Sequence, residues 1–107
     1  MLTTSLKLSK RLKELGVKQK SSEFYYGDNG ERIPALNTDE LLEILPARIE
    51  EYSLRIFKKE DGIYGCMYDL EACDGDHFQL DGEYFEDKNP AEALGLMLEH
   101  LLINKLI

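Results

Sequence analysis

The chain has 107 residues, of which 43% are hydrophobic and 32% are charged, and its formal net charge is −8. This length suits one core, so we predict a single domain over residues 1–107. The composition excludes wholesale disorder, and no apolar run approaches the roughly 18–20 residues that cross a bilayer. The first residues lack the apolar stretch of a secretory signal, so we expect a cytoplasmic protein with no membrane partner.

The charge is unevenly distributed along the chain. Residues 1–20 hold six basic side chains and one acidic one, whereas residues 60–92 hold eleven carboxylates and one lysine. An acidic chain is a poor general binder of nucleic acid, so we expect no nucleic-acid partner. The basic first segment is expected to lie beside the chain's own acidic sheet or to be solvated.

The first predicted element is a short amphipathic helix over residues 4–15. Leu8, Leu12 and Leu15 recur at helical spacing along it. Gly16 then fits the C′ position, where a helix commonly ends.

A β-hairpin is predicted next. The sequence DNG at residues 28–30 is a strong turn signal between the apolar runs FYY and RI. Pro34 has no amide hydrogen to donate, so it places the second strand at a sheet edge or ends it.

The sequence NTDELLEILP predicts a second short helix. Thr38 is expected to cap it, and Pro46 bounds it. Leu41, Leu42 and Leu45 are expected to form its buried side.

From Tyr52 the apolar residues alternate with polar ones, which indicates a strand. KKEDG forms a turn, IYGCMYDLEA returns as a second strand, and brief strands are expected at residues 77–80 and in the sequence EYF. This order predicts an α+β fold (α-ββ-α-ββ-β-α), in which an antiparallel sheet of about four to five strands packs against three helices.

The closing sequence NPAEALGLMLEHLLINKLI predicts a last helix, with Asn89 as its cap and Pro90 at its first position. Its predicted core stripe consists of Leu94, Met97, Leu98 and Leu101. Leu96 and Ile103 lie on nearly the opposite side, close to Glu92 and Glu99. A helix that is apolar on two sides needs a second cover, either the first helix or another subunit in a homodimer through the C-terminal helix.

The sequence contains no convincing catalytic or cofactor-binding constellation. Cys66, Cys73 and His77 could be considered as metal ligands, but their spacing does not match structural zinc sites, so we predict reduced thiols and no metal. DGDHFQLDGE departs from the calcium loop at its fifth and sixth positions. His100 is expected to be structural or exposed. We therefore predict no catalytic residues, no cofactor and no enzymatic activity.

The tyrosines suggest a binding surface instead. Because side chains alternate between the faces of a strand, some tyrosine within FYY and the later strands should face solvent. Exposed tyrosines frequently anchor protein interfaces, although a tyrosine on a wet sheet face is also ordinary.

The segments LKLSKRLKELGVKQKSSEFYY, IPALNTDELLEILP and FEDKNPAEALGLMLEHLL together resemble a family of small uncharacterised bacteriophage and prophage proteins. The resemblance covers nearly the whole chain and implies a mobile-element origin in a bacterial cytoplasm. Residues 54–102 are also similar in the order of their elements to HicB-like antitoxin domains, which implies a shared architecture only.

Two functions follow as hypotheses. The first is a non-enzymatic phage or prophage accessory protein that binds an unknown protein partner. The alternative is an acidic inhibitor that mimics nucleic acid and occupies a host protein's basic groove. The many carboxylates of residues 60–92 motivate this alternative.

Overall fold

The computed structural model describes residues 2–18, 25–28, 30–71 and 75–107. Over these residues the chain forms three helices, α1 (Leu6–Glu14), α2 (Thr38–Ile44) and α3 (Pro90–Ile103). The described strands are β1 (Tyr25–Asp28), β2 (Glu31–Pro34), β3 (Arg48–Ile49), β4 (Tyr52–Lys58), β5 (Tyr64–Glu71) and β6 (His77–Asp87). These elements confirm the predicted α+β class and its three helices.

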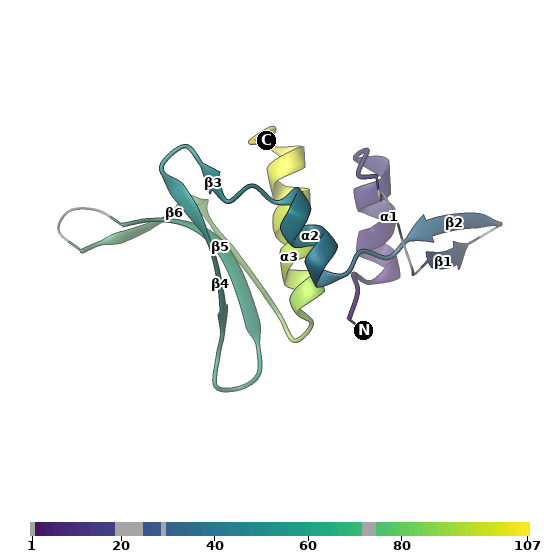
Figure 1. Cartoon of the computed structure of the whole chain (residues 1–107), viewed down its shortest axis with the longest axis horizontal. Coiled ribbons are helices and arrows are strands. Elements are labelled where there is room, and N and C mark those ends of the chain that lie inside the picture. The colour runs from purple at the N-terminus through teal and green to yellow at the C-terminus, as the bar shows by residue number, and fades with distance from the viewer. Residues whose placement is uncertain (1, 19–24, 29, 72–74) are drawn as a thin grey trace.

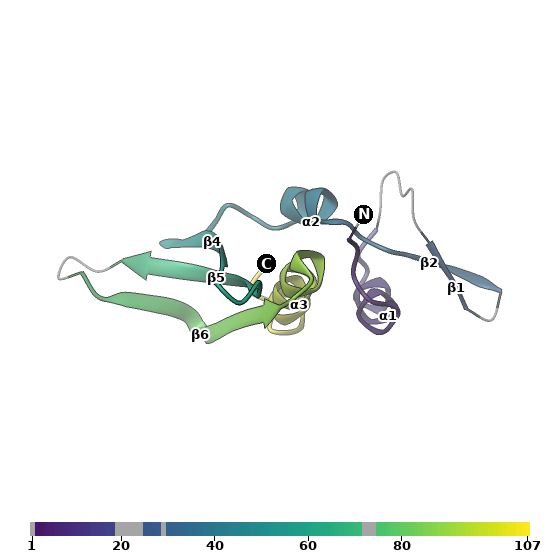
Figure 2. The ribbon, with the colours of Figure 1, turned by 90° about the horizontal axis from the view of Figure 1, so that it is seen from below.

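α3 occupies the middle of the molecule (Figure 1). The four-stranded sheet lies on one flank of α3, α1 lies on the other, and α2 crosses in front. The view from below (Figure 2) shows the same order, with the sheet and α1 on opposite sides of α3. All four residues of the predicted core stripe are buried, namely Leu94, Met97, Leu98 and Leu101.

The strands divide between two sheets, whereas the sequence suggested one. β1 and β2 form a two-stranded sheet, and β3, β4, β5 and β6 follow one another in a four-stranded antiparallel sheet. The hairpin is separate because β2 packs against α1, on the far side of α3 from the larger sheet. Ile33 of β2 is buried there.

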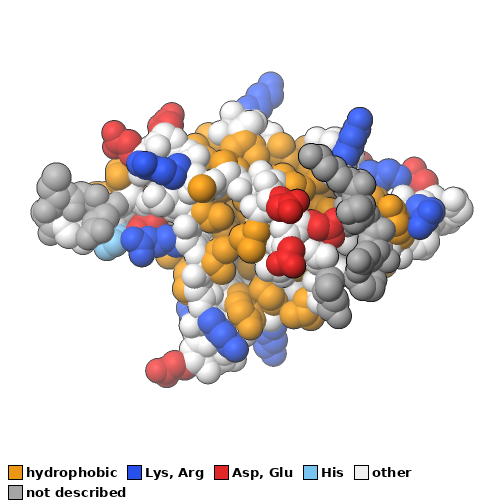
Figure 3. All heavy atoms as spheres, in the orientation of Figure 1, with side chains coloured by type: hydrophobic (Ala, Val, Ile, Leu, Met, Phe, Trp, Pro, Cys, Tyr) orange, Lys and Arg blue, Asp and Glu red, His pale blue; other side chains and the backbone are white. Residues whose placement is uncertain are grey.

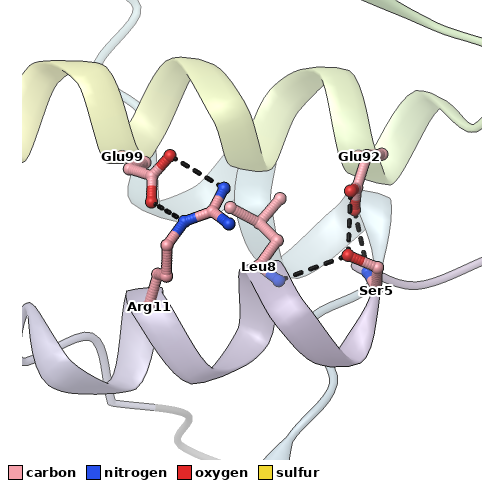
Figure 4. A network of polar contacts seen from close by, with 5 residues as sticks. All are labelled: Ser5, Leu8, Arg11, Glu92 and Glu99. Carbon is pink, nitrogen blue, oxygen red and sulfur yellow. Dashed lines mark hydrogen bonds and ion pairs between the residues drawn. The ribbon is translucent and has the colours of Figure 1, made fainter.

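α1 runs parallel to α3 and is held to it by a pair of polar contacts (Figure 4). The Glu92 carboxylate accepts hydrogen bonds from the backbone N and the Oγ of Ser5, each at 2.8 Å. One turn of α1 beyond Leu8, the Arg11 guanidinium donates to both carboxylate oxygens of Glu99. The basic first helix therefore lies beside acidic residues of α3, rather than beside the sheet.

Between these two contacts the helices meet at Gly95. A Cβ atom on Gly95 would lie 2.7 Å from Leu8 Cδ2 and 2.8 Å from Thr4 Cγ2. Both of these neighbours are buried. The missing side chain at Gly95 is therefore what allows α1 to approach α3 so closely.

α1 and α3 end in the same way. Gly16, with φ of 89°, follows α1 and confirms the predicted C′ residue. Val17 N donates to Leu12 O across this turn at 3.0 Å. At the end of α3, Lys105 takes the corresponding place with φ of 54°, and Leu106 N donates to Leu101 O at 2.8 Å.

Details of α1 and α2 differ from the sequence prediction. Asn37, not Thr38, caps α2, because its side chain accepts from Glu40 N while the Glu40 side chain accepts from Asn37 N. Leu42 and Leu15 were expected to be buried, but both are exposed. Leu41 of α2 and Leu45 at its C-terminal end are buried in the core where α2 meets α3, whereas the adjacent Leu42 faces solvent.

The two brief strands expected after residue 76 are one strand, β6. Met67 of β5 pairs with Tyr84, but Asp69 pairs with Gln79, so β6 bulges at residues 80–83. Asp81 at this bulge has φ of 56°, a conformation that L residues adopt at a modest energetic cost. The bulge explains why the sequence pattern breaks here although the pairing continues.

Candidate protein-interaction surface

The two faces of the four-stranded sheet have different surroundings. α3 contacts β5 and β6, and the inner-face residues Cys66, Tyr68 and Phe85 belong to or pack on the core. Side chains alternate along a strand, so the neighbours of these residues point the opposite way. This outer face carries Arg55, Phe57, Met67 and Tyr84, which we call the outer patch.

The outer patch is built by strand register. Met67 lies opposite Arg55 of β4 and opposite Tyr84 of β6, so these three side chains form one row across the sheet. Tyr84 is 52% exposed, compared with 40% for Tyr25, the other exposed tyrosine among the described residues. Directly opposed residues in adjacent strands lie close enough for their side chains to touch.

The outer end of the Phe57 ring lies over a glycine in the next row. Gly65 is the register partner of Phe57, and a Cβ atom on Gly65 would lie only 2.1 Å from Phe57 Cζ. An aromatic ring that covers a cross-strand glycine is held against the sheet. The signal was present in the sequence, since a glycine within the strand IYGCMYDLEA marks a position where another group approaches the backbone.

A buried carboxylate borders the outer patch. The Asp69 side chain is 3% exposed, and its Oδ2 lies 3.0 Å from Arg55 Nε and 2.9 Å from His77 Nδ1. Asp69 Oδ1 has no hydrogen-bond partner within the described residues. A buried carboxylate is tolerated when it is paired, so Asp69 fixes the positions of Arg55 and His77 at the edge of the patch.

An ion pair closes the opposite end of this face. Lys59 Nζ lies 2.7 Å from Glu86 Oε1, and Glu86 is the register partner of Gly65. This hydrogen bond to Glu86 raises the pKa of the Lys59 ammonium above its ordinary value. The apolar centre of the face thus has charged side chains at both ends, as protein interfaces commonly do.

The predicted solvent-facing tyrosines are confirmed at Tyr84 and Tyr25. They differ in their surroundings. Arg32 lies over the Tyr25 ring at 4.0 Å from its centroid, on the isolated hairpin. Tyr68, by contrast, is buried and donates a hydrogen bond to Pro46 O at 2.7 Å. Tyr84 is therefore the tyrosine that joins a larger apolar patch.

The residues considered as metal ligands are not brought together. Cys66 points into the core from the inner face, whereas His77 contacts Asp69 on the outer face. One ion cannot bind both, because the sheet lies between them. Cys73 lies outside the described residues, and within those residues no group of three histidine, cysteine or acidic side chains is placed to hold a metal.

His100 has a structural environment. Its ring lies against Phe85, with the ring centroids 5.6 Å apart, and its Nδ1 is 3.1 Å from the Asn104 amide nitrogen. The Asn104 amide donates to Nδ1, so the ring hydrogen of the neutral form lies on Nε2. Nε2 in turn faces Asp81 Oδ2 at 3.5 Å, across the bulge of β6.

Burial makes the Cys66 thiol unreactive. It raises the pKa of this thiol to about 12, from an ordinary value of 9.0. In a Cys73→Ser background we expect no labelling by a thiol reagent at pH 8 until the protein is denatured. Rapid labelling of the native protein would contradict the burial of the Cys66 thiol.

The raised pKa of the Cys66 thiol also makes the stability of the fold depend on pH. Its contribution to the free energy of unfolding is present below pH 9 and is lost as the pH rises toward 12.

Three of the described carboxylates of residues 60–92 are engaged within the chain and do not belong to a free acidic strip. Asp69 is buried with Arg55, Glu86 pairs with Lys59, and Glu92 binds Ser5. The nucleic-acid-mimic hypothesis needs carboxylates spread over one surface. It therefore gains less support than the interaction hypothesis.

The described residues define an α+β protein whose four-stranded antiparallel sheet packs its inner face on a central helix and presents the outer patch on its other face. Among the described helices, none is both long enough and apolar enough to cross a membrane. Comparison with protein-family models, with curated proteins and with solved structures finds no match for this chain.

Proposed function

We propose that this chain is a non-enzymatic interaction protein that binds another protein through the outer patch. The observation that carries the proposal is the row of Tyr84, Met67 and Arg55 beside the Phe57 ring, in which Tyr84 and Arg55 are exposed and Met67 is partly buried. Tyrosine, phenylalanine, methionine and arginine are the residue types enriched at protein interfaces. They are gathered here on one sheet face by the register of the strands.

The pre-formed geometry favours binding. Phe57 is held over Gly65, and Asp69 fixes Arg55, so these side chains lose little conformational freedom when a partner arrives. An interface of this kind needs a central apolar anchor surrounded by polar groups. Tyr84 supplies the anchor, and Arg55, Lys59 and Glu86 supply the surrounding charges.

The residues suited to catalysis support the non-enzymatic part of the proposal. The Cys66 thiol is protonated and buried. The His100 ring, on α3, packs against Phe85 of β6. The resemblance to phage and prophage proteins supports a role as an accessory protein of a mobile element. The partner is then a bacterial or phage protein that the chain meets in the cytoplasm.

A single substitution tests the patch. We expect Tyr84→Ala to weaken binding to a protein captured from bacterial lysate by about 30-fold or more, as for an interface hot spot. Tyr25→Ala is the matched control and should leave capture unchanged, because Tyr25 lies on the separate hairpin. Affinity capture followed by titration of the purified partner measures both variants. If the wild-type chain enriches no protein, or if both variants bind equally, the proposal is wrong.

A further inference from the structure

A buried carboxylate anchors an arginine and a histidine at the surface of the sheet. Asp69 Oδ2 lies 3.0 Å from Arg55 Nε and 2.9 Å from His77 Nδ1, and the Asp69 side chain is 3% exposed. Its two partners are open to solvent, with 54% of the Arg55 side chain and 45% of the His77 side chain exposed. Within the described residues, no hydrogen bond or ion pair engages the Arg55 Nη atoms or His77 Nε2. Each partner is therefore held through one nitrogen and can bind a ligand through the others.

Strand register adds a second arginine to this cluster. Arg48 of β3 lies opposite Ser53 of β4, and Ser53 lies opposite Asp69 of β5. Residues that are directly opposed share a sheet face, so Arg48 is on the outer face, two strand spacings or about 10 Å from Asp69. Its exposed side chain can reach toward Arg55 over the small side chain of Ser53. Figure 3 shows basic side chains gathered beside a histidine on the flank of the molecule that the sheet forms.

The cluster has the charge and the donors of an anion site. Arg48 and Arg55 carry two positive charges, whereas Asp69 carries one negative charge and is buried. One positive charge in the cluster is therefore uncompensated even when His77 is neutral. Arginine side chains with free Nη donors bind oxyanions such as carboxylate and phosphate through paired hydrogen bonds. Because Asp69 already holds Arg55 through Nε, the guanidinium loses little conformational freedom when an anion binds.

The tautomer of His77 favours phosphate among the oxyanions. An ionised carboxylate only accepts hydrogen bonds, so His77 Nδ1 donates its hydrogen to Asp69 and the neutral ring accepts at Nε2. A carboxylate ligand also only accepts, so it cannot form a hydrogen bond with the neutral Nε2. A phosphate group titrates near neutral pH, so it can bring the one proton that a hydrogen bond between its oxygen and Nε2 requires. The proton then lies between the phosphate oxygen and Nε2, whichever of the two carried it before binding.

We propose that Arg48, Arg55 and His77 form a binding site for a phosphate group, either free phosphate or the phosphate of a phosphorylated side chain. Arg55 donates to two phosphate oxygens, His77 Nε2 shares a proton with a third, and Arg48 closes the site from β3. Asp69 touches no ligand and acts by positioning Arg55 and His77. The site shares Arg55 with the outer patch, but it does not use Tyr84 and does not rest on the proposed function.

Titration of the intact chain with inorganic phosphate, followed by NMR, tests the site. We expect saturable shifts of the Arg55 Nε–H signal and of the His77 ring signals. Arg48→Gln and His77→Gln should each weaken phosphate binding by about threefold or more, because each removes one charge-assisted contact. Arg55 is kept, because its loss would leave the Asp69 carboxylate buried with a single partner.

Two further variants serve as controls. Arg32→Gln removes an exposed arginine from the separate hairpin, and Tyr84→Ala removes the anchor of the outer patch. Both should bind phosphate as the wild type does. Shifts that do not saturate, or an Arg32→Gln variant weakened as much as Arg48→Gln, would overturn the site. Because Tyr84→Ala is expected to lose the protein partner and to keep phosphate, failure of this inference is distinguishable from failure of the proposed function.

A phosphoserine peptide distinguishes the two sources of phosphate. Tighter binding of this peptide than of inorganic phosphate would identify a phosphorylated protein as the source, and the reverse order would identify free phosphate. Either order supports the site when the same peptide without its phosphate leaves the Arg55 and His77 signals unshifted. Equal binding of the peptide with and without its phosphate would contradict the site.

Discussion

Leu94→Ala is expected to lower the free energy of unfolding by about 2–5 kcal/mol, a large share of the roughly 5–15 kcal/mol typical of a domain. Leu94 is buried in the central helix and belongs to the main core cluster. The loss combines the lost burial of the removed methyl and methylene groups with the cost of the cavity they leave. Equilibrium unfolding in denaturant measures it.

Ile103→Ala on the same helix is the control for this change. Because Ile103 is exposed, its truncation should change the free energy of unfolding by no more than about 0.5 kcal/mol. Equal losses for the two variants would mean that α3 is rotated about its axis relative to the structure.

Gly95→Ala is expected to destabilise the protein by up to about 2 kcal/mol, although alanine is the better helix former. The added methyl would lie within 2.8 Å of side-chain atoms of both Leu8 and Thr4. Overpacking of this kind costs about 1–3 kcal/mol and opposes a propensity gain of about 1 kcal/mol. Because the Ser5–Glu92 and Arg11–Glu99 contacts flank the site, α1 cannot move away without loosening them.

Gly27→Ala provides the comparison for Gly95→Ala. A Cβ atom on Gly27 meets no other heavy atom within 4 Å, so this variant should be neutral or slightly more stable than the wild type. Thermal melting of the two variants decides the point. A Gly95→Ala protein that melts at or above the Gly27→Ala protein would show that α1 does not pack against α3 at Gly95.

The local elements were predictable because their signals lie within a few residues. Asn89 and Pro90 mark the start of α3, Gly16 marks the end of α1, and apolar spacing identifies the core stripe that Leu94 represents. Even so, adjacent signals compete. Asn37 and Thr38 are both good caps, and Asn37 prevails because only its position places Glu40 at the third residue of the helix.

The arrangement of those elements was not predictable in the same way. The hairpin and the larger sheet are separate because one packs near α1 and the other on α3, and no local pattern encodes that choice. The contacts of Ser5 with Glu92 and of Arg11 with Glu99 join residues 87 and 88 positions apart. The outer patch depends on register, which brings Arg55, Met67 and Tyr84 into one row and which the sequence leaves open until the strands are paired.

Side-chain footprinting of the chain with its captured partner tests the central claim most directly. If the outer patch is the binding surface, partner binding should protect Tyr84, Met67 and Phe57 from hydroxyl-radical oxidation. Tyr25, on the separate hairpin, should be oxidised equally with and without the partner. Unchanged oxidation of Tyr84 and Met67 in the complex, with protection at Tyr25 or elsewhere, would contradict the proposed interaction surface.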